Sequence, residues 1–249
     1  MTAPPRRRAL VTGASEGIGR AFARRLAADG YAVTAVARNE DRLRSLTAGL
    51  GPVHRALVAD LATPEGIERV GREVEQGRFH LLVNNAGTAT SGPFTDVPVA
   101  SAAAMMRLNC DAVVALAHAF LAGARAGDVL LNVSSTLAFA PMPNLSVYSA
   151  TKAFVTSFSE SLWHEHKDRG VYVVNLCPGM TSTASQPHTG EGVPEALVQT
   201  PEQVVAAALT ALRQRRRPTV ISGRKNTLFA AAMRALPRRT VLGVLGSDH

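Results

Sequence analysis

The sequence has few cysteines and no long hydrophobic run. Only Cys110 and Cys177 occur among its 249 residues, far apart and without CxxC or Cys/His ligand spacing. This excludes a disulfide framework, and we expect two buried thiols in a reducing compartment. No apolar run approaches the roughly 18 residues that a membrane span needs, and basic Arg6–Arg8 leads into only a short apolar stretch. We therefore expect neither a spanning helix nor a secretion signal, and a cytoplasmic protein.

Repeats, low-complexity segments and metal-ligand motifs are also missing. His164 and His166 lie two apart, so a helix cannot point both rings the same way, and no HExxH motif occurs. We expect no metal site. A hydrophobic fraction of 46% and a mean hydropathy of +0.06 are typical of a globular protein. Without a composition break, one domain over residues 1–249 is the simplest division.

Positive charge is concentrated near the C-terminus. The net charge is +8, and residues 201–249 hold nine basic and two acidic residues. Phe229 is the one aromatic residue in this stretch, which disfavours a nucleic-acid partner because groups that stack on bases are lacking. Two interpretations stay open for the basic tail, residues 224–249: a solvated surface, or contact with an anionic partner such as a membrane or an acyl carrier.

Short β-branched segments alternate with helical patterns along the chain. Strands are expected at Ala9–Thr12, Ala32–Val36, Val53–Ala59, Phe79–Val83, Val129–Val133, Val171–Leu176 and Pro218–Ile221. This alternation predicts an α/β fold with a doubly wound parallel sheet, which binds ligands at the carboxyl ends of its strands. The polar segment 180–199 is too long for a plain connector, and is interpreted either as a substrate loop or as a surface loop.

A glycine-rich turn follows the first expected strand. Gly13, Gly17 and Gly19 stand between that strand and a helix, the context that a phosphate-binding turn requires. The same residues spell G-x-S-x-G around Ser15, the nucleophile elbow of serine hydrolases. That alternative would need a later histidine, for which His188 is the candidate, and an elbow normally follows a central strand and not the first.

The end of the second expected strand indicates which dinucleotide is bound. An NAD site would carry a carboxylate there for the adenosine 2′-hydroxyl, but the strand runs into Arg38. A guanidinium suits the extra 2′-phosphate of NADP. The sequence therefore predicts NADP(H) as cofactor.

Tyr148 and Lys152 place a phenol and an ammonium one helical turn apart. A nearby positive charge lowers the pKa of a phenol, so we expect Tyr148 to exchange a proton near neutral pH. Ser135 ends a strand thirteen residues before Tyr148, where strand-end residues reach the ligand crevice. Ser134 is interpreted as its structural neighbour.

These segments together resemble the short-chain dehydrogenase/reductase family, NADP-preferring branch. The resemblance runs from Ala9 to about Thr183 through Thr12–Gly19, Asp60-Leu61, Asn84-Asn85-Ala86-Gly87, Asn109, Ser135, Tyr148-x-x-x-Lys152 and Pro178-Gly179-Met180-Thr181-x-Thr183. It implies a Rossmann-type fold and a catalytic set of Asn109, Ser135, Tyr148 and Lys152.

The same resemblance implies individual roles. Tyr148 would be the general acid/base, Lys152 would lower its pKa and hold the nicotinamide ribose, Ser135 would orient the carbonyl, and Asn109 would hold a relay water. Leu61 and Asp60 would line the adenine, and Thr183 would contact the carboxamide. The full cofactor-binding set is Gly13, Ser15, Glu16, Gly17, Ile18, Gly19, Arg38, Asp60, Leu61, Asn85, Ala86, Gly87, Tyr148, Lys152, Pro178, Gly179, Thr181 and Thr183.

The sequence thus predicts an NADP-dependent oxidoreductase acting on a carbonyl or secondary alcohol, with a loose likeness to reductases of lipophilic or acyl-type ketones. The alternative is a non-catalytic NADP-binding sensor that docks an anionic partner through its tail, against which the intact Ser135, Tyr148 and Lys152 set argues. The resemblance also implies a homodimer or homotetramer, because Ala- and Leu-rich helices such as those around Ala102–Ala122 and Ser149–Asp168 form dimer interfaces in this family. Packing of these helices on their own sheet alone would explain the same pattern.

Overall fold

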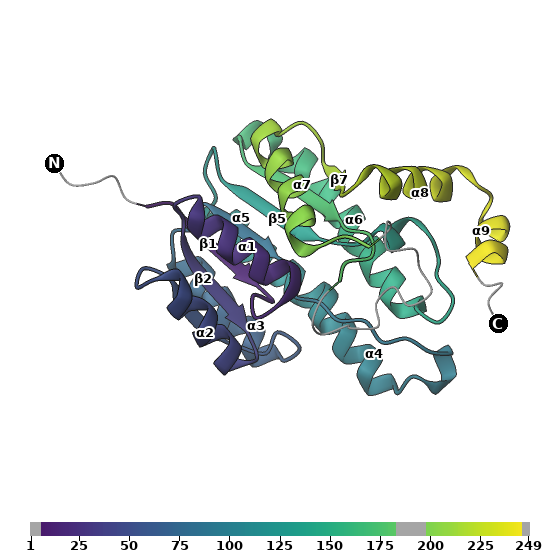
Figure 1. Cartoon of the computed structure of the whole chain (residues 1–249), viewed down its shortest axis with the longest axis horizontal. Helices are drawn as coiled ribbons and strands as arrows, with labels where there is room; N and C mark the ends of the chain where they lie inside the picture. The colour runs from purple at the N-terminus through teal and green to yellow at the C-terminus, as the bar shows by residue number, and fades with distance from the viewer. Residues whose placement is uncertain (1–5, 183–197, 246–249) are drawn as a thin grey trace.

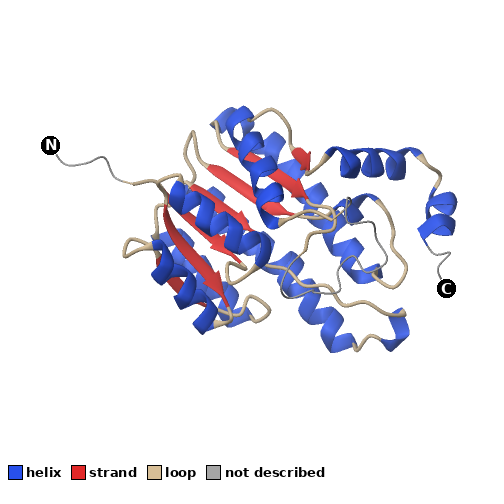
Figure 2. Ribbon diagram, viewed as in Figure 1, coloured by secondary structure: helices blue, strands red, loops and turns tan. Residues whose placement is uncertain are grey.

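A seven-stranded parallel sheet forms the centre of the molecule in the computed structural model, which describes residues 6–182 and 198–245 (Figures 1 and 2). The strands are β1 (Arg8–Thr12), β2 (Ala32–Ala37), β3 (Arg55–Val58), β4 (Leu81–Asn84), β5 (Val129–Val133), β6 (Tyr172–Cys177) and β7 (Thr219–Ile221). Their order is β3-β2-β1-β4-β5-β6-β7. All seven predicted strands are present, with bounds shifted by a residue or two.

Helices cover both faces of the sheet (Figure 2). They are α1 (Gly17–Ala28), α2 (Glu40–Leu50), α3 (Pro64–Gln76), α4 (Val99–Met106), α5 (Ala112–Gly123), α6 (Ser146–His166), α7 (Pro201–Gln214), α8 (Arg224–Ala235) and α9 (Arg238–Leu245). Buried side chains of α1, α2 and α7 pack on one face, and those of α3 and α5, with flanking residues of α6, pack on the other. The predicted doubly wound fold is confirmed.

The strand order reverses direction between β1 and β4. From β1 the chain first builds outward through β2 to β3, and then returns to add β4 to β7 on the other side. The carboxyl ends of β1 and β4 therefore diverge into loops on opposite faces, which leaves the crevice where doubly wound sheets bind their ligands.

Side-chain caps mark the starts of α2 and α7. Asn39 Oδ1 accepts from the Arg42 backbone N–H at 2.9 Å at the start of α2. Thr200 and Gln203 form the reciprocal bonds of a capping box at the start of α7. The helices begin there because these side chains satisfy N–H groups that the first turn leaves without partners.

One continuous helical stretch qualifies the expectation of no spanning segment. Val99–Gly123, which joins α4 and α5, is long and apolar enough to cross a membrane by length and composition, with a mean hydropathy of 1.4. Leu116, Ala117 and Phe120 on this stretch are buried against the sheet and α3. Within the most apolar 18 residues of the stretch, 33% is buried in the described structure.

The two cysteines differ in environment, which corrects the expectation of two buried thiols. Cys177 is fully buried at the end of β6, whereas Cys110 is only partly buried. Both are free thiols, as expected.

Candidate active site

The carboxyl ends of β1 and β4 are tied together by Thr12 and Asn85. Thr12 Oγ1 accepts from the backbone N–H groups of Asn85 and Ala86, both at 2.9 Å. The Asn85 amide donates to the Thr12 carbonyl at 2.9 Å. Because the Asn85 side-chain amide is hydrogen-bonded to β1, Asn85 joins the ends of β1 and β4 at the edge of the crevice.

The glycine-rich turn between β1 and α1 has the backbone that its glycines permit. Gly13 has a φ of +65°, which a residue with a side chain rarely adopts. A Cβ atom on Gly19 would lie 2.2 Å from the Gly13 carbonyl oxygen, so no larger residue fits where α1 meets the turn. Glycine is thus required at both positions by the fold itself.

The N-terminus of α1 suits a bound anion. No side chain caps it and no acidic residue lies in its first turn, whereas α2, α3 and α7 each have a side-chain cap. Its first N–H groups and the positive end of its dipole therefore favour a ligand phosphate. Ser15, Glu16, Gly17 and Ile18 of the predicted cofactor set form this end of the helix and its entry.

Arg38 lies at the end of β2 with 68% of its side chain exposed. Its guanidinium is 4.0 Å from the Asp60 carboxylate, a loose pair in solvent that leaves donors for another anion. A second guanidinium, that of Arg42, binds the Glu16 carboxylate at 2.7 Å beside the glycine turn. Sequence reasoning missed Arg42, although it lies one helical turn after Arg38.

Leu61 is buried next to the crevice, and its predicted contact with the adenine stays a prediction. Its side chain is buried in the core cluster under α3 and α5, so it supports the wall of the crevice by packing. Asp60 is held by the Ala62 backbone N–H, which donates to its carboxylate at 2.9 Å.

Ser135, Tyr148 and Lys152 converge at the end of β5. Ser135 caps the short turn η3 (Thr136–Phe139), and its hydroxyl lies near enough to that of Tyr148 to affect the pKa of the phenol. Lys152 Nζ lies 5.6 Å from the centre of the Tyr148 ring and donates to the Val133 carbonyl at 3.1 Å. The predicted constellation is thus brought together by one strand end and the first turns of α6.

Burial sets the protonation of this group. It raises the pKa of Tyr148, while the hydrogen bond with Ser135 acts in the opposite direction more weakly. It also lowers the pKa of Lys152 to about 8. The expected lowering of the Tyr148 pKa is therefore wrong for the protein's own groups, because desolvation of the phenolate outweighs the Ser135 contact. Tyr148 is a protonated phenol at neutral pH and Lys152 is mostly a cation, a set prepared to donate a proton.

Asn109 is fully buried within a π-helical turn, η2 (Arg107–Asp111), that joins α4 to α5. Its amide nitrogen donates to the Thr88 carbonyl at 2.9 Å and to Thr151 Oγ1 at 3.1 Å, and its Oδ1 accepts from the Thr88 backbone N–H. Gly87 leaves the space between Asn109 and Lys152, since a Cβ there would lie 3.2 and 3.3 Å from their polar atoms. The side chain thus fixes the helix beside Lys152; the relay water remains a prediction.

A row of buried asparagines beneath this site was missed by sequence reasoning. Asn84, Asn132 and Asn175 are register partners on β4, β5 and β6. The Asn132 amide donates to Ser159 Oγ at 2.9 Å, and that of Asn175 donates to Thr156 Oγ1 at 3.1 Å. This asparagine row therefore attaches the sheet to α6. Its signal was one asparagine near the end of each of three apolar strands.

Ser134 also attaches α6 to the sheet, which agrees with the prediction that it is a structural neighbour of Ser135. Its hydroxyl donates to the Lys152 carbonyl at 2.7 Å and is 2.9 Å from Thr156 Oγ1. Helix α6 is thereby held to the end of β5 next to Lys152.

The C-terminal helices cover the segment after β6. Thr136 N–H donates to the Pro178 carbonyl at 2.9 Å, and Thr181 Oγ1 donates to the Gly179 carbonyl at 3.1 Å. A Cβ on Gly179 would lie 2.3 Å from the Asn226 amide of α8. Thr183 and His188 lie outside the described residues, as does most of the predicted loop 180–199.

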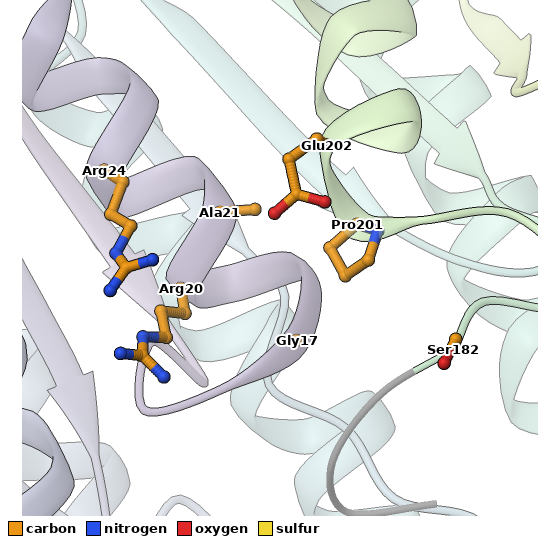
Figure 3. A pocket seen from close by; sticks show the side chains of 7 residues that line it. All are labelled: Gly17, Arg20, Ala21, Arg24, Ser182, Pro201 and Glu202. Atoms are coloured by element: carbon orange, nitrogen blue, oxygen red, sulfur yellow. The ribbon is translucent and has the colours of Figure 1, made fainter. Parts of the chain in front are cut away.

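A cleft of about 170 Å³ opens between the start of α1 and the start of α7 (Figure 3). Arg20 and Arg24 extend from α1, and Glu202 points from α7 toward that helix. The cleft is also lined by Gly17, Ala21, Ser182 and Pro201. It adjoins the phosphate end of the crevice through Gly17 and includes neither Tyr148 nor Lys152.

The chain is similar in sequence to a known family of enzymes. The sequence profile described as short chain dehydrogenase matches residues 7–193. The chain belongs to the short-chain dehydrogenase family. The predictions of this family, of its Rossmann-type fold and of an oxidoreductase are thereby confirmed, and the serine-hydrolase alternative is not supported.

Two curated relatives of this short-chain dehydrogenase are very-long-chain 3-oxoacyl-CoA reductases. That of Anas platyrhynchos is 34% identical over 206 residues, which cover 77% of this chain and 66% of the relative. That of Homo sapiens is 31% identical over 185 residues, covering 70% and 59%. The chain therefore spans about two thirds or less of the length of these relatives.

Solved structures similar to this short-chain dehydrogenase cover nearly the whole chain. A short-chain dehydrogenase from Sphingobium yanoikuyae in complex with NADPH is 31% identical with a TM-score of 0.80, over 98% of this chain and 96% of the other. The bulky-bulky ketone specific alcohol dehydrogenase from Comamonas testosteroni is 29% identical, with a TM-score of 0.79 over 93% and 95%. NADPH in the first structure supports the predicted cofactor.

Proposed function

We propose that this short-chain dehydrogenase is an NADPH-dependent ketoreductase that acts on lipophilic or acyl-type ketones. The observation that carries the proposal is the convergence of Ser135, Tyr148 and Lys152 at the end of β5. The names of the curated relatives, very-long-chain 3-oxoacyl-CoA reductases, support an acyl ketone as substrate. The sensor alternative is not favoured, because a binding module needs none of these three groups in contact.

The residues divide the work of a carbonyl reduction. Bound NADPH would supply the hydride. The Ser135 hydroxyl would hold the carbonyl oxygen of the substrate beside the nearby Tyr148 hydroxyl. Tyr148 would donate its phenolic proton to that oxygen as negative charge develops on it. The buried Lys152 cation would stabilise the tyrosinate that remains.

The residues that would hold the cofactor fit a phosphorylated dinucleotide. The uncapped start of α1 would receive the pyrophosphate. Arg38 would bind the 2′-phosphate, for which its exposed guanidinium is placed at the end of β2. The Arg38→Gln variant should raise the Kd for NADPH by roughly 10- to 100-fold and leave the Kd for NADH unchanged. Fluorescence titration checks this, with Arg24→Gln as the control; equal losses for both cofactors would remove Arg38 from the 2′-phosphate.

The catalytic assignment is tested by NADPH consumption against ketones, β-ketoacyl thioesters and aromatic aldehydes. Tyr148→Phe should lower kcat by at least about 100-fold and leave NADPH binding intact, because only the proton donor is removed. Tyr31→Phe is the matched control, since Tyr31 lies against Arg7 at the start of β2, away from β5. Retained turnover in Tyr148→Phe would refute the assignment.

We also infer that the protein is a homodimer or homotetramer through α4, α5 and α6. Val99, Met106, Val114 and Phe154 are exposed there, with Val99 at 83%. Exposed apolar side chains on adjacent helices are typical of a self-association surface. Light scattering with size-exclusion chromatography tests the mass, and a monomer would refute it. The cytoplasmic localisation stays a prediction.

A further inference from the structure

The outward side of α8 carries an apolar stripe that faces solvent. Asn226, Phe229, Ala230 and Met233 turn inward, and the opposite stripe consists of Leu228, Ala231, Ala232 and Ala235. Leu228 is 71% exposed. The exposed side of α8 thus combines this stripe with the basic side chains of Arg224, Lys225 and Arg234.

The neighbouring helix α9 extends this apolar surface. Leu236, between the two helices, is exposed, and so are Leu242 and Val244 of α9, the latter at 61%. Val241 turns inward and is fully buried. Figure 1 shows α8 and α9 at the edge of the molecule furthest from α2. We call the exposed side of these two helices the α8–α9 face.

The charge around this face is of one sign. Between Gln203 and Ser247 the sequence holds nine basic residues and no acidic one. Five of the nine lie on α8 and α9, namely Arg224, Lys225, Arg234, Arg238 and Arg239. Apolar side chains bordered by cations match the interfacial region of an anionic bilayer, which offers acyl chains beneath negative headgroups.

The α8–α9 face is fixed to the active site. The Arg234 guanidinium stacks over the Phe139 ring at 4.0 Å, and Arg238 donates to the Phe139 carbonyl at 3.1 Å. Phe139 belongs to η3, the turn that Ser135 begins. These contacts attach α8 and α9 to η3, next to Ser135.

The same helices meet the base of the predicted substrate loop. Asn226 of α8 donates to Gln199 Oε1 at 3.0 Å, and Gln199 pairs with Thr181 in a parallel bridge. Both ends of the 183–197 segment are therefore joined at the start of α8. A surface that receives α8 would lie directly against this base.

We propose that the α8–α9 face docks on the surface of an anionic lipid membrane. Leu228, Leu242 and Val244 would insert at the level of the headgroups, and Arg224 and Arg239 would bind headgroup phosphates. The proposal rests on the surface of the protein and holds whatever the substrate of Tyr148 is.

Two other occupants fit less well. A symmetric contact with a second copy would set these cations against the same cations, with no acidic residue between Gln203 and Ser247 to offset them. An acidic carrier protein would match the charge but would leave the stripe from Leu228 to Ala235 without an apolar counterpart. A bilayer satisfies both requirements.

Co-sedimentation with vesicles tests the proposal. The intact protein should sediment with vesicles of phosphatidylcholine and phosphatidylglycerol, should bind vesicles of phosphatidylcholine alone far less, and should be released by salt. Each cation contributes about fivefold to partitioning onto an anionic surface, so Arg224→Gln with Arg239→Gln should lower binding by roughly 30-fold. Leu228→Ser should lower it by about tenfold.

The control is Arg69→Gln with Arg72→Gln, which removes the same net charge from α3 at the far end of the molecule (Figure 1). It should bind vesicles like the unmodified chain, and all variants should retain turnover of a soluble ketone. Three results would overturn the proposal: no sedimentation with anionic vesicles, an equal loss in the α3 control, or loss of self-association in Leu228→Ser, which would assign the face to a second copy. A failed ketoreductase assay leaves the vesicle result interpretable, because the two measurements are independent.

Discussion

Replacing Lys152 with methionine should stabilise the protein at neutral pH and abolish its turnover. The Lys152 side chain is 5% exposed, and no carboxylate pairs with it among the residues that the structure describes. Burial lowers its pKa from 10.5 to about 8. The folded state therefore carries a desolvated cation whose partners are a carbonyl and the face of a ring.

The magnitude follows from the two pKa values. A difference of roughly 2.5 pKa units corresponds to about 3 kcal/mol of unfavourable free energy at pH 7, where the group is charged in both states. Loss of the hydrogen bond to the Val133 carbonyl offsets about 1 kcal/mol of the gain. The net stabilisation is about 2 kcal/mol, which for a chain of this size raises Tm by roughly 4–8 °C.

The pH dependence separates this cause from any gain in packing. Lys152 binds its proton less tightly in the folded than in the unfolded state, so the free energy of unfolding rises with pH between about 8 and 10.5. The unfavourable free energy of burying the Lys152 charge, which Lys152→Met removes, should fall from about 3 kcal/mol at pH 7 to about 1 kcal/mol near pH 9.5.

Urea unfolding of the cofactor-free protein at several pH values measures this difference. Lys167→Met is the control, because Lys167 is exposed and should change stability by less than about 0.5 kcal/mol. If Lys152→Met were less stable than the unmodified chain, or if its advantage did not depend on pH, the reasoning from a desolvated cation would be refuted.

Two further predictions concern the glycine turn and the asparagine row. Gly19→Ala should abolish NADPH binding and lower Tm, because its Cβ would meet the backbone of the turn. The control Gly49→Ala on α2 has open space around the new Cβ and should raise the free energy of unfolding by about 0.5–1 kcal/mol. Equal changes of Tm for the two variants in calorimetry would contradict the close approach at Gly19. Ser159→Ala should cost about 1–3 kcal/mol in urea unfolding because it leaves the Asn132 amide buried without its acceptor, and the exposed Ser161→Ala should be nearly neutral. A neutral Ser159→Ala would show that the row does not stabilise α6.

The fold was predictable because its signals are local. Each strand is a short apolar segment, and residues such as Asn39 and Thr200 mark helix starts through bonds within their own turn. That Ser135, Tyr148 and Lys152 lie together was also predictable, since Tyr148 and Lys152 are one turn apart and Ser135 ends a strand; their catalytic roles stay a prediction. These features depend on spacing along the chain and not on packing at long range.

Other features depend on what the folded chain brings together. Whether the Tyr148 pKa rises or falls is decided by desolvation from distant residues, and only the direction due to Lys152 could be guessed from spacing. The buried position of Leu61 is set by α5, far along the chain. Likewise the contact of Arg238 with Phe139 spans 99 residues and has no local signature.

The asparagine row restricts how this enzyme can move. Apolar surfaces tolerate sliding, but the hydrogen bonds from Asn132 on β5 and Asn175 on β6 to Ser159 and Thr156 exist at only one axial position of α6. A slip of one residue would carry Tyr148 about 1.5 Å along the axis and turn it by about 100°. The hydrogen bonds of the asparagine row therefore fix the position of α6 along the sheet. Any change of shape during a turnover cycle is therefore not expected to include a shift of α6 along the sheet.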